Sequence, residues 1–193
     1  MKLLEDRIRA DGEVLPGGVL KVGKFLNQQM DPALFYAMAE EWKRLYEGCG
    51  VNKILTIEAS GIGIAAIVGL VFGCPVVFAK KSKTSNVTGG VWQTIVESFT
   101  HGVTNTVIVG REFLVPGDKV LIVDDFLANG AALAGMIDLV QQSGAEVAGA
   151  AIAIEKAFQP GGDRIRETGV RVESLARIAA MDPEKGVEFV KDC

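Results

Sequence analysis

Two adjacent carboxylates, Asp124 and Asp125, follow an apolar run and precede a turn of small residues. The apolar run, residues 119–123, is short and rich in β-branched side chains, which is typical of a strand buried on both faces of a parallel sheet. The small residues at 128–132 then lead into a segment whose apolar side chains recur at helical spacing. Ligands of α/β proteins bind at the carboxyl ends of such strands, so chemistry is expected here.

This stretch can bind three kinds of group. The first turn of a helix beginning near Asn129 presents N–H groups without intrahelical acceptors, at the positive end of the helix dipole. A phosphate can bind there without an arginine. Asp124 and Asp125 would repel a phosphate, but they can accept hydrogen bonds from vicinal sugar hydroxyls or hold the water shell of Mg²⁺. The stretch therefore predicts a site for a phosphorylated sugar; for the Asp pair alone, an ordinary acidic turn is the simpler alternative.

The string at 120–132 resembles the signature of the type I phosphoribosyltransferases, which use 5-phosphoribosyl 1-diphosphate (PRPP). That signature has four apolar residues, two acidic residues and a phosphate loop, commonly Ala-Thr-Gly-Gly-Thr. This chain has Ala128, Asn129, Gly130, Ala131 and Ala132 instead. Two hydroxyl donors are missing, and the side-chain amide of Asn129 can replace one of them. With residues 23–32 and 154–156, the variant loop closely resembles the xanthine branch of the family, over nearly the whole chain.

The resemblance implies that a second strand-to-helix turn, at 58–63, binds the pyrophosphate of PRPP through its backbone, with Ser60 and Gly61 as the candidates. The same turn also matches the G-x-G-x-x-A dinucleotide fingerprint, so an NADP-binding Rossmann oxidoreductase is an alternative. An NAD site would require an acidic residue about twenty positions further on. This chain has Lys80 and Lys81 there, and a dinucleotide site would leave Asp124 and its neighbour without a role.

The resemblance also implies a purine site under an N-terminal hood, formed by Leu20, Asn27 and Lys156. A lysine favours 6-oxopurines, which present an acceptor, over adenine, which presents a donor. The implied reaction is purine salvage, in which xanthine and PRPP give xanthosine 5′-monophosphate and pyrophosphate with Mg²⁺ as cofactor. Simpler interpretations are a solvated strand cap for Lys156, a turn residue for Asn27 and a core position for Leu20. The role of Phe158 stays open, and His101 is assigned no catalytic role.

The composition is that of a compact single-domain protein. The chain has 193 residues and a formal net charge of −4, which disfavours nucleic acid as a partner. Its three cysteines, Cys49, Cys74 and Cys193, lack metal-ligand spacing and indicate a reducing compartment, and the first residues lack an apolar signal core. We therefore expect a cytoplasmic location. The uncharged stretch at 59–79 is interrupted by turn residues and predicts a buried βαβ unit, without a membrane span.

The expected architecture is α/β, with the type I phosphoribosyltransferase fold: a mostly parallel twisted sheet flanked by helices, with a hood and a flexible hairpin lid. One domain covers 1–193, with hood and terminal segments at 1–37 and 158–193. Asp31 is the expected N-cap of a helix. The predicted helices are 32–47 and 62–72; the predicted parallel strands are 53–58, 76–79, 119–123 and 147–154, with 170–175 on an edge.

The segment at 80–116 is expected to form the lid. Residues 91–98 and 104–109 read as a hairpin, and the preceding segment is polar, basic and glycine-bearing. Lys81 in that segment is a candidate to close over the pyrophosphate and exclude water. A plain exposed hairpin is the alternative.

The resemblance further implies a homodimer. A regulatory protein that binds PRPP without catalysis is a second functional class. It would require a nucleic-acid-binding element, but the residues before position 32 are too few for a winged helix and show no basic face.

Overall fold

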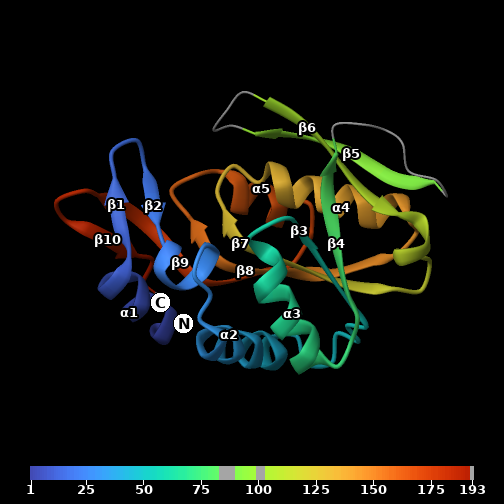
Figure 1. Ribbon diagram of the computed structural model, residues 1–193, viewed down its shortest axis with the longest axis horizontal. Helices are drawn as coiled ribbons and strands as arrows, with labels where there is room; N and C mark the ends of the chain where they lie inside the picture. Colours follow the sequence, from blue (N-terminus) through green and yellow to red (C-terminus); the bar gives the residue numbers. More distant parts are fainter. Residues whose placement is uncertain (83–89, 99–102, 192–193) are drawn as a thin grey trace.

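The computed structural model describes residues 1–82, 90–98 and 103–191. An eight-stranded sheet, in the order β10-β9-β8-β7-β3-β4-β6-β5, forms the centre of the molecule, with α2 and α3 on one face and α4 and α5 on the other (Figure 1). The strands of this sheet are β3 (Lys53–Ile57), β4 (Val76–Ser82), β5 (Val91–Ser98), β6 (Val103–Gly110), β7 (Lys119–Leu127), β8 (Glu146–Lys156), β9 (Val172–Asp182) and β10 (Gly186–Phe189). The helices are α1 (Lys2–Asp11), α2 (Pro32–Leu45), α3 (Gly61–Phe72), α4 (Ala131–Gln142) and α5 (Gly161–Glu167).

Five neighbouring strands, β9, β8, β7, β3 and β4, run parallel, and antiparallel strands flank them on both sides. The predicted mostly parallel α/β sheet is therefore confirmed. The edge position expected for 170–175 is wrong, because β9 pairs with β8 on one side and with the four-residue strand β10 on the other. A strand as short as β10 carries too little periodicity to be found in the sequence.

Two element boundaries differ from the prediction in the most informative stretch. Strand β7 continues through Leu127, because its ladder with β8 extends to the pair formed by Leu127 and Glu155. Asp124 and Asp125 thus lie within the strand instead of after it. Helix α4 begins at Ala131, two residues later than the expected start near Asn129.

The buried side chains form two clusters, one on each face of the sheet. In β7, Leu121 and Val123 pack toward α2 and α3, whereas Val120 and Ile122 pack toward α4. Burial on both faces explains why this strand reads as a continuous apolar run. Helix α2 begins as predicted, since the Leu34 N–H donates to the Asp31 carboxylate at 3.1 Å.

The N-terminal segment folds over one end of the sheet. It comprises α1, a small hairpin of β1 (Glu13–Leu15) and β2 (Val19–Lys21), and a π-helical turn at Gly23–Asn27 (Figure 1). Helix α1 and the hairpin lie beside β9 and β10. The sequence placed a hood at 1–37 but predicted neither α1 nor the hairpin, because each is short and buries few side chains.

Strands β5 and β6 form the predicted hairpin, and β6 extends the sheet from β4. The hairpin lies over α4, where the Gln142 side chain donates to the Gln93 carbonyl at 2.9 Å. The paired part is therefore packed against a helix. His101 and residues 83–89 lie outside the described residues, and the lid function assigned to 80–116 stays a prediction.

The uncharged stretch at 59–79 divides into a turn, helix α3 and most of strand β4, as its internal turn residues predict. In the described part of the chain, every helix is too short or too polar to cross a bilayer.

Candidate active site

The carboxyl ends of β3, β7 and β8 lie side by side, because the three strands are adjacent and parallel. This arrangement brings together the turn at 58–61, the Asp124–Asp125 pair and Lys156, as the sequence predicted for the ends of parallel strands. The N-terminal segment supplies a fourth component. The side-chain amide of Asn27 donates to the Asp125 carboxylate at 3.4 Å.

The two acidic side chains have different surroundings. Asp124 is 6% exposed, and its carboxylate accepts a hydrogen bond from the Asp125 N–H at 2.9 Å. Burial, followed by the neighbouring charge of Asp125, raises the pKa of Asp124 well above its ordinary value. Asp125 is half-buried and faces Asn27. Asp125 is therefore the more accessible of the two carboxylates to a ligand under the hood, and Asp124 is the more buried.

The turn after β3 is packed directly onto β7. A Cβ atom at Gly61 would overlap the Thr56 hydroxyl and would lie 3.5 Å from the Asp124 carboxylate, so only glycine allows this approach. The peptide bond between Glu58 and Ala59 is cis. Ser60 occupies the N-cap position of α3, but its side chain makes no capping hydrogen bond.

Thr56 is a residue that sequence reasoning missed. Its hydroxyl is fully buried beneath Gly61 and has no hydrogen-bond partner among the described residues. A polar residue between the apolar residues Leu55 and Ile57 of strand β3 was the available signal.

The backbone of Lys81 contacts the same turn. Its N–H donates to the Glu58 carboxylate at 2.5 Å, while its side chain is exposed. The rest of the basic segment that was expected to close over the site begins at Lys83 and lies outside the described residues.

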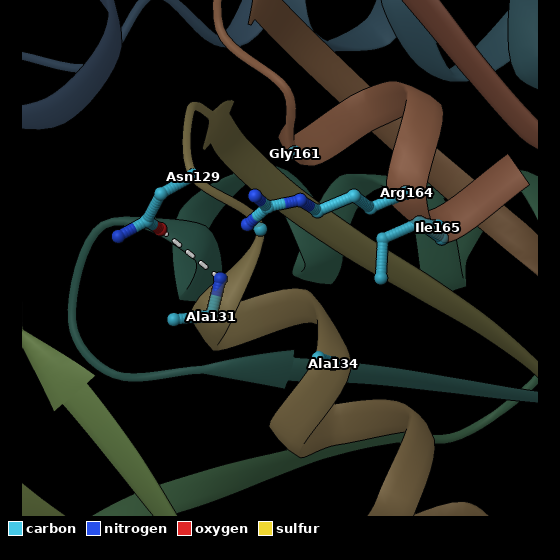
Figure 2. Close-up of a pocket in the computed structure, with 7 residues that line it drawn as sticks. Asn129, Ala131, Ala134, Gly161, Arg164 and Ile165 are labelled. Carbon is cyan, nitrogen blue, oxygen red and sulfur yellow. Dashed lines mark hydrogen bonds between the residues drawn. The ribbon is translucent and has the colours of Figure 1, made fainter.

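The loop at 128–132 ends in the first turn of α4. Gly130 has a left-handed backbone with φ of +86°, and the Asn129 side-chain oxygen accepts a hydrogen bond from the Ala131 N–H at 3.0 Å (Figure 2). An open cavity of about 320 Å³ lies beside this loop. It is lined by Asn129, Gly130 and Ala131 of the loop and by Gly161, Arg164 and Ile165 of α5. The sequence did not single out α5 as part of the site.

The three candidates for the purine site lie around the N-terminal hairpin. The Lys156 ammonium donates to the Gly18 carbonyl at 2.8 Å and lies 5.9 Å from the centre of the Phe126 ring. Burial lowers the pKa of Lys156. Leu20 is buried and Asn27 half-buried. Lys156 is thus half-buried and tied to the hood, unlike a freely solvated strand cap.

Residues 37–176 match the phosphoribosyl transferase domain family. The chain belongs to the phosphoribosyltransferase family. It is 58% identical over 186 residues to the xanthine phosphoribosyltransferase of Lachnoclostridium phytofermentans, with 96% of each chain covered. It is 53% identical over 191 residues to that of Bifidobacterium adolescentis, with 98% of this chain and 99% of the relative covered.

Solved structures of family members share the fold. APRTase from Giardia lamblia complexed with 9-deazaadenine gives a TM-score of 0.78 at 22% identity, over 92% of this chain and 98% of that chain. Adenine phosphoribosyltransferase from Rhodothermus marinus gives 0.74 at 20% identity, over 92% and 100%. The type I fold is therefore confirmed, and the family membership decides against the dinucleotide-binding interpretation of the turn at 58–63.

Proposed function

We propose that this chain is a xanthine phosphoribosyltransferase of purine salvage, which converts xanthine and PRPP to xanthosine 5′-monophosphate and pyrophosphate. The contact between Asn27 and Asp125 carries the proposal, because it joins the predicted base site to the acidic pair at the predicted ribose site. The relatives that bear this name match nearly the full length of the chain.

The geometry supports a separate role for each strand end. We assign the pyrophosphate of PRPP to the turn containing Ser60 and Gly61, with Lys81 beside it. The ribose hydroxyls would donate to Asp125 and Asp124. The 5-phosphate would bind the N–H groups of the loop at 128–132.

Xanthine would bind between Leu20, Asn27 and Lys156. The Lys156 ammonium can donate to the exocyclic oxygen of a 6-oxopurine, while the Asn27 amide offers both a donor and an acceptor. Lys156 is partly buried. Because a surrounding of low dielectric constant screens electrostatic attraction less than water does, burial strengthens the attraction between the ammonium and a bound purine oxygen.

In the reaction, a purine ring nitrogen forms a bond to C1 of ribose while the bond from C1 to the pyrophosphate oxygen breaks. Pyrophosphate leaves with the electron pair of that bond, the ring nitrogen loses its proton to water, and positive charge develops transiently on the ribose ring. We infer that the protein acts by positioning both substrates and by placing the carboxylates of Asp124 and Asp125 beside that charge.

The donor set at the acidic pair fits Mg²⁺, which prefers carboxylate oxygens and retains several waters. In the described part of the chain, no group of three or more His, Cys, Asp or Glu side chains is arranged to hold a metal ion by itself. Asp124 and Asp125 would therefore hold Mg²⁺ together with oxygens of PRPP and water. Bound Mg²⁺ supplies neutralisation of the pyrophosphate charge.

We further propose a homodimer located in the cytoplasm. Large apolar side chains are exposed on neighbouring elements, namely Tyr36 on α2, Leu70 on α3 and Phe78 on β4, and such side chains favour association. Cys49 and Cys74 are free thiols, which suits a reducing compartment. Light scattering on the purified protein tests the dimer, and cell fractionation tests the location.

The test of the function is to incubate the purified chain with Mg²⁺, PRPP and one base at a time: xanthine, guanine, hypoxanthine, adenine, uracil or orotate. We expect nucleotide and pyrophosphate to form in equal amounts, fastest with xanthine. PRPP binding without product from any base would favour the regulatory alternative and would refute the enzyme assignment.

A further inference from the structure

The cavity beside the phosphate loop is formed by two elements that are distant in the sequence. Asn129 and Ala131 line one side, at the start of α4, and Arg164 lines the other side, on α5 (Figure 2). This inference rests on the proposed function, which assigns the 5-phosphate of PRPP to the loop at 128–132.

The loop by itself offers few donors for a phosphate. It contains no hydroxyl side chain, and the Ala131 N–H is already bonded to the Asn129 side chain. A phosphate monoester carries a charge of about −1.5 to −2, whereas the start of a helix supplies about half a positive charge. Asp124 and Asp125 precede the loop and bring further negative charge. A cation beside the loop would therefore strengthen the binding of the phosphate.

Arg164 is the cation that the cavity provides. Its side chain is exposed, and Figure 2 shows its guanidinium extending toward the loop between Asn129 and Ala131. Side chains of a helix lean toward its N-terminus, which directs Arg164 back over Gly161. Within the described residues, no carboxylate forms an ion pair with Arg164, whereas Arg166 on the same helix is bonded to Glu155.

Helix α5 is held in contact with the loop at its first residue. The Gly161 N–H donates to the Ala128 carbonyl at 3.2 Å, and a Cβ atom at Gly161 would overlap the backbone of Ala128, Asn129 and Gly130. The pair of Arg166 with the buried Glu155 fixes the other side of the helix. These contacts of α5 therefore fix the backbone of Arg164 relative to the loop.

We propose that Arg164 binds the 5-phosphate of PRPP and supplies the charged donors that the loop lacks. A guanidinium presents a planar pair of N–H groups that matches two phosphate oxygens, so this arginine would compensate for the hydroxyls missing at positions 129 and 132.

The test measures direct binding of two probes, ribose 5-phosphate and pyrophosphate, by calorimetry. Arg164→Gln should weaken the affinity for ribose 5-phosphate by about tenfold or more, since even one charge-assisted hydrogen bond contributes about that much, and should leave pyrophosphate affinity unchanged. Arg164→Lys keeps the charge but loses the planar pair of donors. Its affinity for ribose 5-phosphate should lie between those of the wild type and Arg164→Gln. Lys185→Gln is the control, because it removes one positive charge from the exposed turn between β9 and β10. Its affinities for both probes should equal those of the wild type. Thermal unfolding checks that each variant is folded.

Unchanged ribose 5-phosphate affinity in folded Arg164→Gln would overturn the proposal. An equal loss of affinity for both probes, or an equal loss in Lys185→Gln, would also overturn it. The net charge of the protein, and not a contact with the 5-phosphate, would then explain the result. Because the assay measures binding and needs no base, it gives a result even if no base is converted to a nucleotide. A wild-type chain that binds neither probe would refute the proposed function together with this inference.

Discussion

Replacing Arg166 by methionine should strongly destabilise the protein, because it leaves a buried carboxylate with one partner fewer. The Glu155 side chain is 2% exposed, and Arg166 donates to both of its oxygens, at 2.8 and 2.7 Å. A Cβ atom at Gly162 would overlap this pair, so the helix is built around it. Arg177 is a second cation, with its Nε 3.3 Å from the same carboxylate.

The size of the effect follows from these contacts. Breaking a fully buried ion pair costs about 3–5 kcal/mol, but Arg166 is 30% exposed and Arg177 remains in place. We therefore expect Arg166→Met to lower the free energy of unfolding by about 2–3 kcal/mol. Arg44→Met is the matched control, since Arg44 and Glu41 form a similar 2.7 Å pair on the surface, with 65% and 33% of the side chains exposed. It should cost less than about 1 kcal/mol.

The assay is urea unfolding followed by tryptophan fluorescence, with a double-mutant cycle that adds Glu155→Gln. In the Glu155→Gln background, loss of Arg166 should cost much less, because no buried charge remains without a partner. The reasoning is refuted if Arg166→Met costs no more than Arg44→Met, or if its cost is the same with and without Glu155.

The pH dependence gives an independent check. Burial raises the pKa of Glu155, but the hydrogen bonds from Arg166 and the charges of Arg166 and Arg177 outweigh it, so the pKa lies below its ordinary value. The stabilisation is therefore complete above the unfolded-state pKa, about 4.3, and is lost as the pH falls through the lower folded-state pKa. The difference between wild type and Arg166→Met should accordingly shrink below about pH 4.

Four further predictions concern the site. Asp124→Asn should raise the melting temperature at neutral pH, because burial and Asp125 raise the pKa of Asp124, so that its ionisation opposes folding. The gain in melting temperature should vanish near pH 4, about the unfolded-state pKa. A lower melting temperature at neutral pH would contradict this prediction. Asp124→Asn with Asp125→Asn should abolish turnover in a folded protein, and near-normal PRPP affinity would exclude the proposed metal and diol role. Lys156→Ala should raise KM for 6-oxopurines by about tenfold or more while sparing PRPP binding, and an unchanged base preference would return Lys156 to a surface role. Gly161→Ala should displace the phosphate loop and weaken ribose 5-phosphate binding in calorimetry, whereas unchanged affinity would show that the loop adapts.

Local patterns predicted most of the elements near the site. The apolar run of β7, the capping Asp31 and the turns that divide 59–79 each depend on neighbouring residues alone, and the structure confirms them. The errors arose where distant segments decide the outcome. The ladder with β8 extends β7 past Asp125, and pairing with β10 places β9 inside the sheet.

By itself, the sequence determined the two strand-to-helix loops and the acidic pair, because the residues that make each of them are consecutive. Only the tertiary structure decided what meets them. Asn27 reaches Asp125 across 98 positions of the chain, Lys156 reaches Gly18 across 138, and Arg164 lines the cavity of a loop on another element. Such contacts depend on how strands order and helices pack, and no local spacing specifies them.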